Sequence, residues 1–350
     1  TSVKKAIGSL CPDIVYPNYQ DNDYAKVIID KKSIKNIKEN LGQIDDEFLR
    51  SLLWNDLWQM VLDQKLSVVS FLEIVEFQGL AENNNDTLKS ILSHVALSLK
   101  AYFPEDTIEW KAKKQKWVKF FESAYLIKIE DQKENIDRQK MWFENLVLIS
   151  ESPELHDKFA TMLKAPGKGI KLSFEVDQDR RWNLLYKIAS YGHKDSISLL
   201  NYEKNRDPSK RGEMNALYVE SVEPRKETKE KMLRRVVNGS KKESLGQLKA
   251  IMGGLFPENQ KALQREFSDR YYEMLKTIIK KDDHLMIGNF TKSLVPTLCD
   301  DESTTKLKDF MSAEKLPFGV MKSLKRALQE NDRCVGIKAL LKDEKQPKVL

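Results

Sequence analysis

Histidines are the side chains in this sequence best suited to bind a metal ion or transfer a proton near neutral pH. The 350 residues contain four of them: His94, His156, His193 and His284. A metalloprotease helix requires the spacing His-Glu-x-x-His, which does not occur, and no two histidines lie near each other. Each is interpreted as a surface or half-buried helical residue, with Asp282-Asp283 as a helix cap before His284. The sequence thus predicts no catalytic residue and no metal ligand in this chain, and leaves the substrate-binding residues unknown.

Motifs that bind phosphate, activate a serine or hold calcium are also absent from the sequence. Neither Gly-x-Ser-x-Gly nor Gly-x-x-x-x-Gly-Lys-Ser/Thr occurs, and Gly167-Lys168-Gly169 has no strand before it. Asp21-Asn22-Asp23 resembles the start of a calcium loop. Lys26 stands where such a loop needs glycine, and Lys32 stands where it needs an acidic residue. Gly167-Lys168-Gly169 is therefore interpreted as a loop and Asp21-Asn22-Asp23 as a turn.

A lysine-rich run between Trp110 and Trp117 is the best candidate for nucleic-acid binding. Lys113, Lys114 and Lys116 lie there between the two tryptophans, and this mixture of cations with aromatic residues suits phosphate contact. The alternative is the solvent face of a helix with two amphipathic anchors. We favour this alternative because glutamates flank the run and the 59 basic residues of the chain nearly balance its 53 acidic ones.

The elements that would position any site are predicted to be helices, and Leu49 to Leu80 is the clearest example. Its leucines recur at intervals of three and four residues until Asp63-Gln64-Lys65 interrupts them. Ser67 then suits the N-cap of a second helix, and Gly79 its end. Two such helices form a hairpin that cannot bury its own apolar face, so we expect further hairpins to stack on it.

The composition and the small number of glycines and prolines extend this interpretation to the whole chain after residue 30. Hydrophobic residues make up 41% and charged residues 32%, while only 14 glycines and 11 prolines occur. From Ser33 onward helix follows helix, about fifteen in all, and no apolar run approaches the length of a membrane span. We predict an all-α fold: an α-solenoid of antiparallel helical hairpins, a HEAT/armadillo-like superhelix.

The predicted domains are a junction at residues 1–30 and a helical solenoid at residues 31–350, with an internal division considered near residues 165–178. The β-rich runs Ile14–Tyr16 and Tyr24–Ile29 flank turn residues, so they are predicted to form a short β-ribbon at a missing upstream domain. Cys11, Cys299 and Cys334 match no disulfide framework and no zinc spacing. With no signal-peptide core at the start, they favour a reducing, cytoplasmic location.

Short strings spread over most of the chain carry a family resemblance. They are Pro17-Asn18, Asp21, Asp23-Tyr24-Ala25-Lys26-Val27, Asp30, Leu53-Trp54, Leu57-Trp58-Gln59-Met60-Val61, Arg181-Trp182, Glu203, Asp207-Pro208-Ser209 and Pro224-Arg225-Lys226. In this order they are similar to the interdomain junction and C-terminal domain of the aminopeptidase N family, which contains gluzincin zinc aminopeptidases. The zinc helix and the Gly-Ala-Met-Glu-Asn type of substrate loop are not in this sequence.

The resemblance implies a non-catalytic C-terminal domain that curves over the zinc-bearing domain and encloses a cavity for peptides. Expected partners are therefore the upstream catalytic domain of the same polypeptide and peptide substrates, with zinc in the catalytic domain, no cofactor in this chain, no nucleic acid and no membrane. Asn18, Asp21, Asp23 and Tyr24 are the predicted interdomain interface. The alternative is a freestanding helical-repeat adaptor that binds a protein or nucleic acid.

Overall fold

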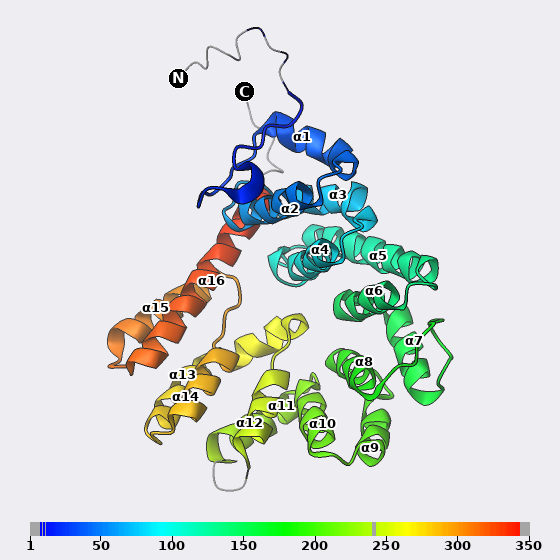
Figure 1. The fold of residues 1–350 in the computed structure, drawn as a ribbon. Coiled ribbons are helices and arrows are strands. Elements are labelled where there is room, and N and C mark those ends of the chain that lie inside the picture. The colour runs from blue at the N-terminus through cyan, green and yellow to red at the C-terminus, as the bar shows by residue number, and fades with distance from the viewer. Residues whose placement is uncertain (1–7, 9, 11, 240–242, 344–350) are drawn as a thin grey trace. The chain divides into compact units, whose positions relative to one another are not determined.

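The computed structural model describes residues 8, 10, 12–239 and 243–343, and within them every regular element is a helix (Figure 1). The predicted all-α class is therefore confirmed. The chain divides into two compact units, one of residues 1–98 with 336–350 and one of residues 99–335. The predicted division near residues 165–178 falls inside the second unit. Among the described helices, none is both long and apolar enough to cross a membrane.

The first unit contains four complete helices and the end of a fifth. These are α1 (Lys31–Asn40), α2 (Glu47–Leu62), α3 (Val68–Phe77), α4 (Asn85–Leu97) and the last residues of α16 (Phe318–Asp343). Helices α2 and α3 are the predicted hairpin, and the Ser67 hydroxyl caps α3 by accepting the Ser70 N–H at 3.1 Å. Both helices bury their apolar faces, with Leu57 and Phe71 wholly inaccessible to solvent.

Aromatic side chains fill the space between α2, α3 and α4. Trp58 contacts Phe71 with 5.3 Å between ring centroids, and it stacks on His94 at 4.2 Å with an angle of 9° between the planes. Burial lowers the pKa of His94 to about 4, so the imidazole is neutral at ordinary pH. His94 is therefore a residue of the core, which agrees with its interpretation as a half-buried helical histidine.

The second unit continues the helical pattern. It contains α5 (Ile108–Asp131), α6 (Ile136–Ile149), α7 (Pro153–Lys164), α8 (Gln178–Ser190), α9 (Ser196–Arg206), α10 (Lys210–Val222), α11 (Lys226–Asn238), α12 (Leu245–Gly254), α13 (Lys261–Ile279), α14 (His284–Leu294), α15 (Asp301–Ala313) and the larger part of α16. Most of these helices pack against the next one in sequence. The even-numbered helices α6, α8, α10, α12 and α14 also pack in turn against one another.

Buried charged groups tie α8 to α9 in this unit. The Arg181 guanidinium donates to the Glu203 carboxylate and, at 2.8 Å, to the Leu163 carbonyl, and its side chain is 3% exposed. The Trp182 indole N–H donates to Asp207 at 2.8 Å. The residues Arg181, Trp182, Glu203 and Asp207 therefore serve packing here, because most of the polar atoms that they bury have a hydrogen-bond partner, the Arg181 Nε being an exception.

A disulfide bond joins Cys299 to Cys334, with 5.3 Å between their Cα atoms. The prediction of no disulfide was wrong for this pair. The two cysteines are 35 residues apart, so their sequence spacing alone matches no known framework. They meet because α15 and α16 fold back on each other. The Asn331 side chain, on the same face of α16, accepts the Cys299 N–H at 2.8 Å and donates to the Asp300 carbonyl at 2.9 Å.

The predicted β-ribbon at Ile14–Ile29 is not formed among the described residues. A short 3-10 turn, Tyr19–Asp21, stands between two extended runs that carry no strand assignment. Each run pairs with helices instead of with the other run. The Val15 N–H donates to the Ser33 hydroxyl at 3.0 Å, and the Ile29 N–H lies 3.3 Å from the Met60 sulfur. β-Propensity was overridden by these tertiary contacts.

Candidate functional site

Three of the four residues predicted at the interdomain interface are brought together by one buried asparagine. The Asn18 side-chain amide donates to the Asp21 carboxylate at 3.0 Å and to the Asp23 carbonyl at 2.9 Å, and its oxygen accepts the Asp23 N–H at 3.1 Å. Asn18 is only 7% exposed, so it shapes the turn from within. Asp21, Asp23 and Tyr24 are exposed, and Tyr24 projects fully into solvent.

The segment around this turn concentrates exposed apolar side chains. Five of the 16 large hydrophobic residues exposed in the structure fall within residues 10–28: Leu10, Val15, Tyr19, Tyr24 and Ile28. The segment is nevertheless anchored to its own unit, since the Tyr16 hydroxyl donates to the Asp56 carboxylate at 2.7 Å. Burial raises the pKa of Tyr16 far above its ordinary value, and Asp56 raises it further. An anchored segment with an apolar outer side is typical of a surface that another domain covers.

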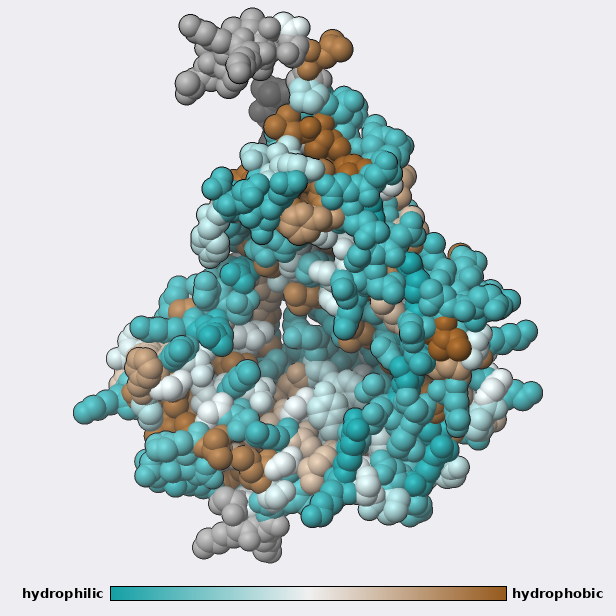
Figure 2. Space-filling view, viewed as in Figure 1, coloured by the Kyte–Doolittle hydropathy of each residue, from teal (hydrophilic) through white to brown (hydrophobic). Residues whose placement is uncertain are grey.

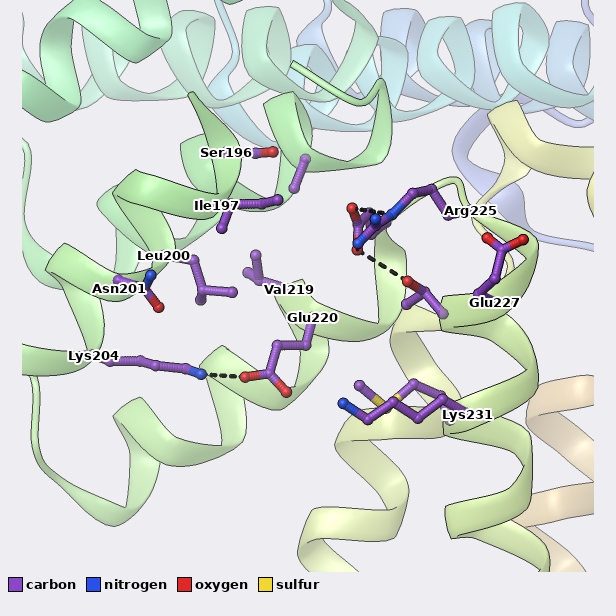
Figure 3. A pocket seen from close by; sticks show the side chains of 14 residues that line it. Ser196, Ile197, Leu200, Asn201, Lys204, Val219, Glu220, Arg225, Glu227 and Lys231 are labelled. Carbon is purple, nitrogen blue, oxygen red and sulfur yellow. Dashed lines mark hydrogen bonds and ion pairs between the residues drawn. The ribbon is translucent and has the colours of Figure 1, made fainter. Parts of the chain in front are cut away.

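The second unit holds a groove of about 580 Å³ where α9 begins, α10 ends and α11 begins (Figure 3). Its floor is apolar and consists of Leu200, Val219 and Met232, while Ile197 stands at the edge with 57% of its surface exposed. Gly192 supports this arrangement, because its φ of +68° turns the chain before α9 and a Cβ there would lie 3.2 Å from the Pro224 ring.

Charged side chains form the rim of the groove, and most of them are paired. Lys204 forms an ion pair with Glu220 across the gap between α9 and α10 (Figure 3). The Glu223 carboxylate accepts from Arg225 at 2.6 Å and from the Thr228 hydroxyl at 3.0 Å. The hydrogen bond to Glu223 raises the pKa of Arg225. An apolar floor and a rim of paired charges suit the groove to binding an amphipathic segment.

The remaining histidines lie apart from both features. His156 is buried, and burial lowers its pKa to about 4, while His193 lies 3.0 Å from the Asp157 carboxylate. Asp283 caps α14 by accepting the Met286 N–H at 3.0 Å, as predicted for the residue before His284. Over the part of the chain that the structure describes, no group of three His, Cys, Asp or Glu residues is placed to hold a metal ion.

Comparison with known proteins identifies the family to which this chain belongs. Residues 14–333 match the family model of the ERAP1-like C-terminal domain. The chain belongs to this family. It is also 25% identical over 325 residues to aminopeptidase N of Streptomyces lividans, an alignment that covers 93% of this chain and 37% of that relative. The chain therefore corresponds to a C-terminal domain of the aminopeptidase N family and spans little more than a third of the relative's length.

The lysine-rich run of this C-terminal domain does not form one basic surface. Lys114 is 9% exposed and lies between Glu105 at 2.8 Å and Glu151 at 3.1 Å. The Lys113 ammonium lies 4.9 Å from the centre of the Trp110 ring, and Lys116 faces solvent. The three side chains therefore point into different surroundings. On the face drawn in Figure 2, hydrophilic residues predominate and the hydrophobic ones form separate groups.

The groove and the turn differ in how far the sequence could reveal them. Pro17-Asn18 followed by two aspartates is a turn signature, so the turn was within reach of sequence reasoning. The groove was missed because its lining comes from four helices of the C-terminal domain, α8 to α11. Only Pro224, which begins the turn into α11, gave any signal for its position.

Proposed function

We propose that this chain is the non-catalytic C-terminal domain of a zinc-dependent aminopeptidase, which caps the active site and encloses the cavity for the peptide substrate. The observation that carries this proposal is the family match over residues 14–333 in a sequence that lacks the His-Glu-x-x-His zinc helix. Zinc and the catalytic groups then belong to a separate domain of the same polypeptide, as the greater length of the aminopeptidase N relative suggests.

The packing of the helices supports an α-solenoid as the architecture behind this role. Each even-numbered helix from α6 to α14 contacts the next even-numbered one, and neighbouring helices pair, which is the arrangement expected of stacked hairpins. Such stacks expose one long surface on which an extended peptide can lie. In this proposal the peptide is held by contacts with helices of this chain while its N-terminal residue reaches the zinc.

The N-terminal segment is the proposed seam with the catalytic domain. Its exposed side chains Tyr24 and Ile28 would be buried by that domain, and Asp21 and Asp23 would supply polar contacts at the rim. The cytoplasmic location expected from the sequence is less well supported, because the Cys299–Cys334 disulfide is unusual for a reducing compartment.

The test is a reconstitution with the separately expressed upstream domain. We expect the chain alone to be inactive on amino-acid amides with zinc present, and mixing to give a complex by size exclusion with altered selectivity for peptide length. Tyr24→Glu with Ile28→Glu should prevent the complex, whereas Ile127→Glu, at a residue 61% exposed on α5, should not.

Two results would overturn the proposal. Turnover by the pure chain would reveal a catalytic site within it. Failure of the unaltered chain to form any complex would instead favour a freestanding adaptor, and strongly salt-dependent binding of nucleic acid would identify one class of its ligands.

A further inference from the structure

A pocket of about 360 Å³ lies in the second unit against the loop of residues 165–177, which joins α7 to α8. Its walls come from this loop, the end of α7, the start of α8 and the last residue of α9. The volume is at the lower end of the range for small-molecule sites in proteins. The pocket shares no lining residue with the groove at the start of α9.

The loop is anchored to both neighbouring helices, so the walls of the pocket are formed before a ligand arrives. Gly169 has a φ of +86°, and a Cβ there would lie 2.8 Å from the Lys158 carbonyl oxygen, because the loop packs closely on α7. The Ser173 N–H donates to the side-chain oxygen of Gln139 on α6 at 2.8 Å. A pocket with fixed walls loses little conformational entropy when it binds.

Apolar side chains form much of the wall. Met162 and Ile170 are buried, with 5% and 8% of their surface exposed. Leu172, Phe174 and Val176 are half-buried, so part of each faces the pocket or solvent. An apolar group that enters the pocket removes its own surface and theirs from water, which favours binding.

Three cationic side chains line the same pocket without an anionic partner. Lys168 and Lys171 stand on the loop, Arg206 ends α9, and all three are exposed. Among the described residues, no carboxylate oxygen lies within 4.0 Å of any of their side-chain nitrogens. A fourth cation in the wall, Arg181, is only 2% exposed and is already paired with Glu203. The three outer cations are therefore the ones open to an anion.

Arg206 is held in an orientation that suits an anion. Its Nε donates to the side-chain oxygen of Gln178 at 3.1 Å, and the Gln178 amide donates to the buried Glu203 carboxylate at 2.9 Å. These bonds position the guanidinium, while its two terminal nitrogens donate to no other described residue. Such a planar pair of donors matches the spacing of phosphate oxygens.

The balance of charge around the pocket favours a dianion. Glu175 also lines the pocket, so three unpaired cations and one carboxylate leave a surplus of two positive charges. A phosphate monoester carries about −1.5 to −2 charges at pH 7 and accepts hydrogen bonds through three oxygens. A sulfate ester carries a single negative charge and matches this surplus less well.

We propose that this pocket binds a small phosphate monoester with an apolar tail. The phosphate lies among Lys168, Lys171 and Arg206, and the tail lies against Met162 and Ile170. All the walls belong to residues 162–206, so the site goes beyond the proposed role as a capping domain, and its failure would leave that role untouched.

The experiment titrates the intact chain with n-octyl phosphate by calorimetry at pH 7.5, below the concentration at which the ligand forms micelles. Three comparison ligands separate the contributions. Inorganic phosphate has only the head, octyl glucoside has the tail with a neutral head, and octyl sulfate has the tail with one negative charge. Octyl phosphate should bind at least about tenfold more tightly than the first two and severalfold more tightly than octyl sulfate.

Variants of the cations test where the phosphate lies. Lys168→Met combined with Lys171→Met, and Arg206→Met alone, should each weaken binding of octyl phosphate about tenfold or more, because charge-assisted hydrogen bonds are lost. The matched control combines Lys116→Met with Lys119→Met, at two exposed lysines of α5. It removes the same charge outside the pocket and should leave binding unchanged.

Other outcomes count against the site. Equal binding of octyl glucoside would show that the cations do not contact the ligand, and equal binding of inorganic phosphate would place the tail outside the pocket. Octyl sulfate bound as tightly as octyl phosphate would refute the argument from charge balance. If the α5 control lost as much affinity as the pocket variants, the attraction would come from the net charge of the chain and not from this site.

Discussion

Replacing Lys229 with methionine should stabilise this domain, and by an amount that depends on pH. Lys229 lies on α11 with none of its surface exposed, and its ammonium donates to the Ser221 carbonyl at 2.7 Å. Burial lowers its pKa from an ordinary value of 10.5 to about 7, against a weaker upward effect of Glu223. Burying the charged Lys229 amine therefore lowers the stability of the native state.

The magnitude follows from proton linkage. Below pH 7 the lysine is protonated in both states, and burying its charge costs about 5 kcal/mol, since each pKa unit corresponds to about 1.4 kcal/mol. Between pH 7 and pH 10.5 the unfolded chain holds a proton that the native state has released. The unfolded state then binds more protons, so the free energy of unfolding rises with pH by about 1.4 kcal/mol per unit.

Methionine keeps the apolar stem and forfeits the hydrogen bond to Ser221, which is worth about 1 kcal/mol. The free energy of unfolding of the Lys229→Met variant should therefore exceed that of the unaltered chain by about 4 kcal/mol at pH 6 and by only about 1 kcal/mol at pH 9. Urea unfolding followed by circular dichroism at half-unit steps of pH measures this difference directly. Lys231→Met, at an exposed lysine on the same helix, is the matched control and should show no such trend.

The reasoning would be refuted if the free energies of unfolding of Lys229→Met and of the unaltered chain differed by the same amount from pH 6 to pH 9. It would mean that Lys229 does not change its protonation in this range in the native state. A methionine variant less stable at every pH would show that the hydrogen bond to Ser221 outweighs the burial of the charge.

Three further changes should destabilise the second unit. Arg181→Met leaves the buried Glu203 carboxylate unpaired and should lower the free energy of unfolding by about 3–5 kcal/mol in urea titrations. Gly212→Ala should cost at least about 2 kcal/mol by the same assay, because the new Cβ would lie 2.1 Å from a backbone oxygen. Reducing Cys299–Cys334, which closes a 35-residue separation, should remove about 4 kcal/mol and lower the melting temperature.

Two of these changes have a control in the chain. Gly288→Ala, inside α14 with no heavy atom within 4 Å of its Cβ position, should gain up to about 1 kcal/mol from helix propensity. A variant with alanine at both cysteines should not respond to reductant. If Gly212→Ala is as stable as the unaltered chain, the close approach to the backbone of residue 207 is relieved by a shift of the helix.

Local signals in the sequence predicted the helices well and their ends less well. The α2–α3 hairpin and the caps at Ser67 and Asp283 follow from periodicity and from side chains that reach only three residues. Asp86 and Thr87 are both residue types that favour an N-cap, yet the cap of α4 is Asn84, whose side chain accepts both of their N–H groups. Two adjacent polar residues compete for this role, and propensity alone does not decide between them.

Features that depend on distant residues were beyond the sequence. Lys187 and Lys229 read as ordinary members of a charged helix face, because nothing in their neighbourhood along the chain marks them as buried. Their burial follows from which helices pack across α8 and α11. Distant contacts also explain why the predicted β-ribbon is not formed. Val15 and Ile29 have strand-like neighbours in the sequence, but α1 and α2 supply better partners than the opposite run does.

The bond between Cys299 and Cys334 closes a covalent ring around α15 and the first half of α16. A protease that cuts once inside this ring, in the loop of residues 314–317 between the two helices, separates no fragment from the rest. The nicked chain keeps its full mass on a non-reducing gel and gives two pieces only after reduction. Intact mass under non-reducing conditions is therefore no proof of an uncut backbone in preparations of this domain.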